Sequence, residues 1–241
     1  MDVTIDINIP DTWNLLTDDQ LKRIAKAQNL KGDLFDLAVW LILNNAHKYN
    51  FVKKHKLKAV LQLVPLSELK THYKFIYEDV KREKFIDLVG YKKPLDRLFD
   101  FSIERFSYAD GLFNKFLETN DYNYLQHLTA VLYLKKNEVF NWDLQNQRAK
   151  RFKRLPKHIL IAVHLCYSGC KNHLVKKYPK VYPKVISQQK KSNGNHSFLD
   201  VVLSMSGQKF GTYNETKATR LHTFMSEFTN TIITQEKWKE K

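Results

Sequence analysis

The first ten residues alternate between apolar and polar side chains. Val3, Ile5, Ile7 and Ile9 are apolar, the residues between them are polar, and the pattern ends at Pro10. A period of two predicts a β-strand with one buried face. Because no second strand pattern follows nearby, we expect this strand to pair with a distant segment or with a neighbouring subunit.

After Pro10 the apolar spacing becomes helical. Thr17 is followed three residues later by Gln20, which is the spacing of a capping box, and predicts a helix that ends near Ala27. A second helix is predicted from Asp33 to about Asn45. A third is predicted to begin near Pro65 and to run to about residue 80.

The most regular amphipathic patterns lie in the middle of the chain. Ser102 and Asp121 are each followed by apolar residues at helical spacing, so both are predicted N-caps. Residues 85–98, which include Gly90 and Pro94, are predicted to form an irregular connection.

The last hundred residues are predicted to be helical with one break. A polar helix is expected over about 143–154, and Pro156 favours the start of an apolar helix that runs toward Tyr178. Tyr-Pro-Lys then occurs twice, at 178–180 and 182–184, and predicts an extended or polyproline-like segment. Two helices are expected at about 197–206 and 215–234.

These patterns predict a mainly α fold: a helical bundle with a short N-terminal β-strand and a C-terminal helical pair. The chain has only seven glycines and six prolines in 241 residues, which disfavours a turn-rich β fold. The predicted parts are residues 1–140 (strand and bundle), 141–186 (basic helical segment), 187–196 (a polar linker) and 197–241 (C-terminal helices).

Positive charge is concentrated in one part of the chain. Between Asp143 and Asp200 there are thirteen Lys and Arg and no acidic residue, whereas the rest of the chain carries 27 basic and 25 acidic residues. Nearly all of the formal net charge of +15 therefore lies in this segment. A charge excess of this kind indicates an anionic partner or shielding within an assembly.

Three interpretations of the basic segment stay open. It could bind nucleic acid through phosphates, with the repeat tyrosines stacking on bases; it could dock on an acidic protein; or it could be a solvated surface. The residues predicted to contact nucleic acid or an acidic partner are Arg148, Lys150, Arg151, Lys153, Arg154, Lys157, Lys176, Lys177, Lys180 and Lys184.

Two residue clusters were weighed as metal sites. His164, Cys166, Cys170 and His173 have zinc-ligand chemistry, but a second ligand pair elsewhere in the chain is missing, so two buried thiols in a core helix are the preferred interpretation. Asp96, Asp100 and Glu104 recur every four residues, but the arginines between them favour ion pairs and capping over a magnesium site.

Known catalytic signatures are absent from the sequence. It contains no P-loop, dinucleotide-binding, zinc-protease or nucleophile-elbow motif. We therefore expect no enzymatic activity, no cofactor, no bound metal and no small-molecule substrate. No run of eighteen apolar residues and no basic, apolar leader is present, so neither a membrane partner nor secretion by a signal peptide is expected.

Several short patterns resemble helical proteins of the structural modules of tailed bacteriophages. They are Leu16-Thr17-Asp18-Asp19-Gln20-Leu21, residues 101–110 (FSIERFSYAD), residues 128–133 (LTAVLY), the helix that follows Leu155-Pro156, and Phe210-Gly211-Thr212-Tyr213. This resemblance implies a virion or assembly protein of the head, connector or tail, without a catalytic residue to transfer.

The expected function is therefore structural. A phage particle or assembly protein would act through protein–protein contacts, as an oligomer, with its basic face toward an acidic neighbour or DNA. The alternative is a non-specific nucleic-acid-binding protein. The expected location is the host cytoplasm during assembly, with the finished virion as an open alternative.

Overall fold

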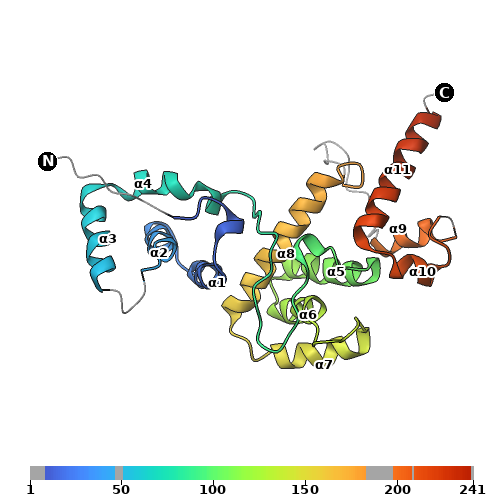
Figure 1. The fold of residues 1–241 in the computed structure, drawn as a ribbon, viewed down its shortest axis with the longest axis horizontal. Coiled ribbons are helices and arrows are strands. Elements are labelled where there is room, and N and C mark those ends of the chain that lie inside the picture. The colour runs from blue at the N-terminus through green and yellow to red at the C-terminus, as the bar shows by residue number, and fades with distance from the viewer. Residues whose placement is uncertain (1–8, 47–50, 183–197, 208, 240–241) are drawn as a thin grey trace.

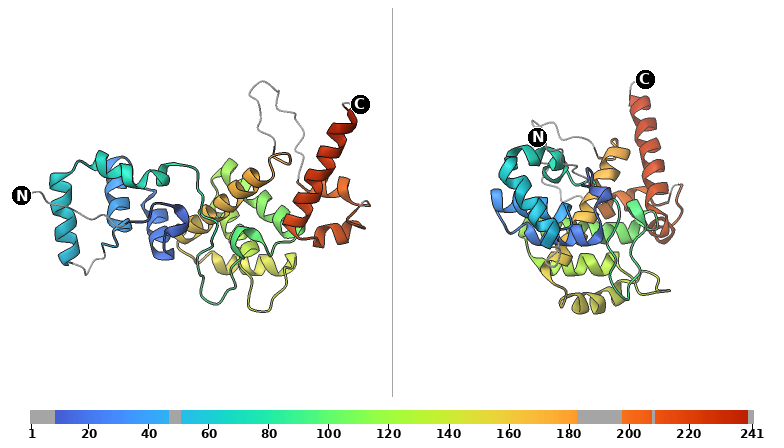
Figure 2. Two further views of the ribbon diagram at one scale, coloured as in Figure 1. Left: turned by 45° about the horizontal axis from the view of Figure 1, so that its top comes forward. Right: turned by 60° about the vertical axis from the view of Figure 1, so that its left-hand side comes forward.

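The structure is a computed structural model that describes residues 9–46, 51–182, 198–207 and 209–239. It is mainly helical, as predicted, and the helices form three groups along an elongated molecule (Figures 1 and 2). Within the described ranges the only β pairing is two isolated bridges, Lys92 with Leu134 and Ser102 with Arg220. The predicted strand from Val3 lies outside the described residues except for Ile9.

The first group contains α1 (Asp18–Ala27), α2 (Asp33–Leu43), α3 (Phe51–Leu63), α4 (Leu66–Leu69) and the 3-10 helices η1 (Trp13–Leu15) and η2 (Lys70–Tyr77). The predicted capping box is confirmed: Gln20 N–H donates to the Thr17 hydroxyl, and Thr17 N–H donates to the Gln20 side chain. The helix expected after Pro65 is a single α-helical turn, α4, and the chain then continues as the 3-10 helix η2.

The second group is the central body. It contains η3 (Asp96–Leu98), α5 (Ile103–Thr119), α6 (Tyr122–Leu132), α7 (Trp142–Phe152) and α8 (Lys157–Lys177). Ser102 and Asp121 cap α5 and α6, as predicted, by accepting a hydrogen bond from a backbone N–H of the first turn. Helix α8 packs against α1 as well as α6, so the buried core runs through the first and second groups without a break at residue 140.

The third group contains α9 (Phe198–Met205), α10 (Tyr213–Ala218) and α11 (Leu221–Lys239). The helix expected at 215–234 is two helices separated at Thr219 and Arg220, because these residues instead join α5. Ile103 N–H donates to Thr219 O, and Leu221 N–H donates to Phe101 O. Beyond its buried first turns, α11 projects from the body (Figures 1 and 2).

Two buried arginines stabilise the C-terminal end of α6. Arg105 of α5 donates to the carbonyl oxygens of Val131 and Leu132, and Arg148 of α7 donates to that of Ala130. The last carbonyls of a helix have no partner within the helix, so these guanidinium groups satisfy acceptors that burial would otherwise leave unpaired. Burial lowers the pKa of Arg105 to about 10, which the charge of Asp100 opposes.

Candidate functional site

The basic segment is divided by the fold into interior and surface parts. Arg148 is 2% exposed and forms an ion pair with Glu138, so its charge is neutralised inside the protein and is not available to a partner. Lys180 is paired with Glu236 of α11 at 2.7 Å. Lys184 lies outside the described residues. Arg148 and Lys180 are therefore already paired with carboxylates of this chain.

Five cations of that set remain exposed around the turn between α7 and α8. They are Lys150, Arg151, Lys153, Arg154 and Lys157. In the described part of the chain none of the five has a carboxylate within ion-pair distance; Lys157 instead lies over the Tyr122 ring, 4.8 Å from its centre. Five cations without counter-charges on one turn produce a positive potential that an incoming polyanion would neutralise.

Helix α1 extends this positive region. The pKa of His158, at the start of α8, is lowered by burial first and then by the charges of Lys26 and Lys22 of α1. Both lysines therefore lie close to the α7–α8 turn. We define the cationic surface as the five exposed cations of that turn together with Lys22 and Lys26. Sequence reasoning missed the α1 contribution because it depends on the packing of helices 130 residues apart.

The tyrosines of the Tyr-Pro-Lys repeat are not part of this surface. Residues 178–182 form a turn, because Val181 and Tyr182 N–H both donate to Tyr178 O, and the predicted extended or polyproline-like conformation is wrong there. Tyr178 is buried and its hydroxyl contacts His222 Nδ1 at 3.0 Å. Tyr182 is half-buried, and burial raises its pKa. Neither ring is presented for stacking on a base.

A groove of about 1400 Å³ lies between the first group of helices and α8. Its floor is an irregular segment, residues 79–83, which we call the strap. Gly169 of α8 touches the strap so closely that a Cβ there would lie 2.1 Å from the carbonyl oxygen of Arg82. Arg82 itself is 3% exposed; it donates to the Trp13 and Leu16 carbonyls and pairs with Asp18. The strap thus joins the first group to the body.

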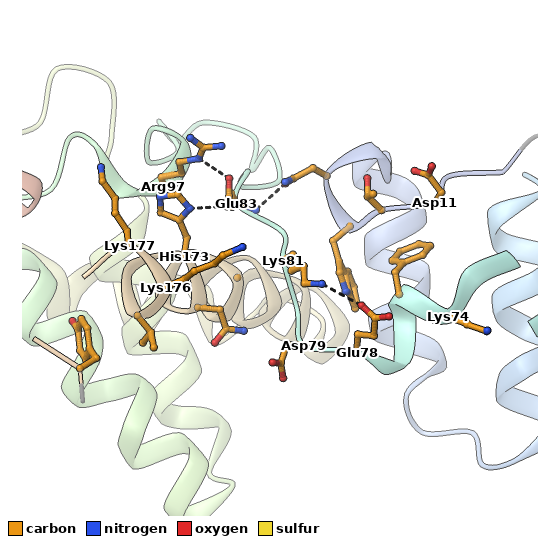
Figure 3. Close-up of a pocket in the computed structure, with 18 of the residues that line it drawn as sticks. Asp11, Lys74, Glu78, Asp79, Lys81, Glu83, Arg97, His173, Lys176 and Lys177 are labelled. Carbon is orange, nitrogen blue, oxygen red and sulfur yellow. Dashed lines mark hydrogen bonds and ion pairs between the residues drawn. The ribbon is translucent and has the colours of Figure 1, made fainter. Parts of the chain in front are cut away.

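One wall of the groove is basic (Figure 3). His173 lies one turn before the adjacent Lys176 and Lys177 on α8, and Arg97 lies beside His173. Glu83 fixes two of these groups: its carboxylate lies 2.5 Å from Arg97 Nε and 2.8 Å from His173 Nδ1. A histidine that donates from Nδ1 in its neutral form keeps Nε2 as an acceptor.

The opposite wall carries more acidic groups. Asp11 and Glu78 lie there, together with Lys74, and Asp79 lies at the start of the strap (Figure 3). Glu78 is paired with Lys81 at 3.1 Å, whereas Asp11 and Asp79 have no ion-pair partner in the described part of the chain. The sequence had not singled out this groove, because Glu83 and His173 meet across ninety residues.

The two residue clusters considered as metal sites are occupied by structural contacts. Cys166 and Cys170 are buried; burial raises the pKa of Cys166 to about 12 and that of Cys170 well above its usual value, so both thiols stay protonated at neutral pH. His164 instead stacks on Phe113. Among the described residues there is no group of three His, Cys, Asp or Glu side chains placed to hold a metal.

The carboxylate series is also engaged within the fold. Asp100 lies 3.5 Å from Arg105 and accepts from Leu95 N–H, and Glu104 pairs with Lys217 at 2.5 Å. The Asp100 contacts agree with the local pairing that was expected, whereas Glu104 contacts α10, far away in the sequence. None of the helices described in the structure is both long and apolar enough to cross a bilayer.

Comparisons with protein-family models, with curated proteins and with solved structures find no match to this chain.

Proposed function

We propose that the chain is a structural or assembly protein of a tailed-phage particle, which acts by contact and whose cationic surface binds DNA without sequence preference. The resemblance of its short sequence patterns to phage structural proteins supports the first part. The observation that carries the second part is the set of exposed cations around the α7–α8 turn, which lack carboxylate partners in the described part of the chain.

The geometry favours phosphate contacts over base contacts. The cations project from the ends of two helices and from α1, so they are spread over a rigid surface. Arginine and lysine neutralise phosphates wherever the backbone passes, without reading base edges. The repeat tyrosines, which could have stacked on unpaired bases, are used to anchor the chain instead.

The test is the salt dependence of DNA binding. Each phosphate contact contributes about 0.9 to the slope of log K against log salt. Replacement of Arg151 and Arg154 by Glu should lower this slope by about 2 and weaken binding of a labelled DNA duplex in fluorescence anisotropy titrations. The matched control reverses the charges of Lys56 and Lys58, which are exposed on α3 at the far end of the molecule (Figure 1).

Equal effects of the two pairs would show that net charge, not this surface, drives binding, and would contradict the proposal. An acidic protein neighbour is the second candidate, since carboxylates would satisfy the same cations. Binding to polyglutamate that depends on Arg151 and Arg154, together with no binding to DNA, would show that the cationic surface binds an acidic protein instead of DNA. Gene order tests the phage part: capsid, portal or tail genes should flank the gene.

A further inference from the structure

The basic wall of the groove, formed by Arg97, His173, Lys176 and Lys177, has more positive charge than its surroundings neutralise. Glu83 balances Arg97, with which it is paired at 2.5 Å. Lys176 and Lys177 are exposed, and neither has a carboxylate within ion-pair distance in the described part of the chain. They lie at the C-terminal end of α8, where the helix dipole supplies only about half a negative charge. An excess of positive charge therefore remains at this wall even while His173 is neutral.

The groups of the basic wall lie close together, although they come from different elements. His222 of α11 shows this, because its Nε2 donates to the Arg97 carbonyl oxygen at 2.9 Å. Burial is the largest cause that lowers the pKa of His222, and the charges of Lys177, His173 and Arg97 lower it further, against the effect of this hydrogen bond. In Figure 3, Arg97 and His173 lie side by side, with Lys177 next to them. An anion at this end of the groove would be attracted by all three groups.

His173 adds a hydrogen-bonding group that a phosphate can use. Its Nδ1 lies 2.8 Å from the Glu83 carboxylate, whereas its Nε2 has no hydrogen-bond partner in the described part of the chain. Because an ionised carboxylate can only accept, Nδ1 carries the proton of the neutral ring. Nε2 then accepts from a protonated phosphate oxygen, or donates to a phosphate dianion when the ring is charged. Glu83 thus orients the imidazole so that one ring nitrogen is left for a ligand.

The rest of the groove favours a small ligand over a nucleic acid. Its volume of about 1400 Å³ is comparable with the larger small-molecule sites, which reach about 1,000 Å³. Asp11 on the opposite wall and Asp79 at the start of the strap have no ion-pair partner in the described residues. A DNA duplex, with one negative charge about every 1.7 Å, would bring phosphates against these carboxylates as well. A ligand with one phosphate and an uncharged remainder would place its charge at the basic wall alone.

We propose that the basic wall binds the phosphate group of a small molecule, whose uncharged part extends along the groove. Arg97 and the lysines supply the charge, and His173 supplies a hydrogen bond through Nε2. This ligand goes beyond the proposed function, since neither assembly contacts nor DNA binding requires it. The two sites are also separate in space: the cationic surface lies at the N-terminal end of α8 and the basic wall at its C-terminal end, about 30 Å away along the helix.

The experiment is isothermal titration calorimetry of the full-length protein with glycerol phosphate, inorganic phosphate and glycerol. Both phosphates should bind, glycerol phosphate more tightly because its glycerol part lies in the groove, and glycerol alone should not. Lys176→Gln/Lys177→Gln should weaken both phosphates by about tenfold, the loss expected for one hydrogen bond between charged groups. These lysines are exposed, so the variant should fold. The matched control, Lys150→Gln/Lys153→Gln, removes the same charge from the cationic surface and should leave both affinities unchanged.

Several outcomes would overturn the proposal. No binding of either phosphate, or equal weakening by the two variant pairs, would exclude a specific site at the basic wall. Tighter binding of inorganic phosphate than of glycerol phosphate would exclude a larger ligand in the groove. Displacement of glycerol phosphate by duplex DNA would place it on the cationic surface instead. The DNA salt slope should be unchanged in Lys176→Gln/Lys177→Gln, so failure of the phosphate site is distinguished from failure of the cationic surface.

Discussion

Gly169 is the position at which one added methyl group should have the clearest effect. In most helix interiors Gly→Ala is stabilising by about 1 kcal/mol, because alanine loses less backbone entropy. At Gly169 the new Cβ would lie 2.1 Å from Arg82 O and 2.6 Å from Arg82 N. Both atoms belong to the backbone, so no side-chain rotation can relieve the contact, and α8 must move away from the strap.

The loss of stability follows from the hydrogen bonds that this movement would stretch. Two of them join α8 to the strap beside Gly169: Asn172 donates to Val80 O at 2.9 Å, and His173 Nδ1 lies 2.8 Å from the Glu83 carboxylate. Each such hydrogen bond contributes about 1 kcal/mol, and forced overpacking costs about 1–3 kcal/mol. After the gain of about 1 kcal/mol in helix propensity, Gly169→Ala should reduce the free energy of unfolding by about 2–4 kcal/mol.

Gly111 of α5 supplies the matched control. It also lies inside a helix, but a Cβ there would meet nothing within 4 Å, so Gly111→Ala should be stabilising by about 1 kcal/mol. Urea denaturation followed by circular dichroism measures both changes, with the slope of the unfolding free energy checked for constancy. A Gly169→Ala variant as stable as the wild type would refute the close contact between α8 and the strap.

Two further predictions concern buried ionisable groups. Arg148→Met should cost about 3–5 kcal/mol of unfolding free energy, since it leaves Glu138 and Ala130 O without their partner, whereas Arg151→Met should change stability by less than about 0.5 kcal/mol; equal costs in thermal melts would contradict the division of the basic segment. Burial lowers the pKa of His164 to about 4. The neutral imidazole therefore contributes on the order of 3 kcal/mol to the free energy of unfolding. This contribution is fully present above the unfolded-state pKa of about 6.5 and is lost as pH falls through the folded-state pKa of about 4. His164→Phe should flatten the pH dependence of unfolding over that window, and an unchanged profile would exclude His164 as its source.

Local sequence signals predicted those elements whose ends are specified by side chains. Thr17, Ser102 and Asp121 each cap a helix by a hydrogen bond within the first turn, so the signal and the structure lie within a few residues. Helix α3 was missed because its lysines obscure the apolar spacing. The tyrosine repeat was misread because its conformation is set by contacts with His222, 44 residues away.

The candidate site was only partly predictable for the same reason. The concentration of positive charge is visible in the sequence, but the fate of each cation depends on distant atoms. Arg148 is bound in the interior by Ala130 O and Glu138, and Lys180 is paired with Glu236. The groove depends on Glu83 and His173, which no spacing rule connects.

The buried guanidinium of Arg82 has a consequence for how the protein unfolds. It is held by oxygen atoms of Trp13, Leu16 and Asp18, while its own backbone rests on Gly169. Detachment of the N-terminal helices would break these contacts together and expose the apolar surface that α1 and α8 bury against each other. The first group and the body should therefore melt as one cooperative unit, and amides of α1 and α8 should share the same exchange rate.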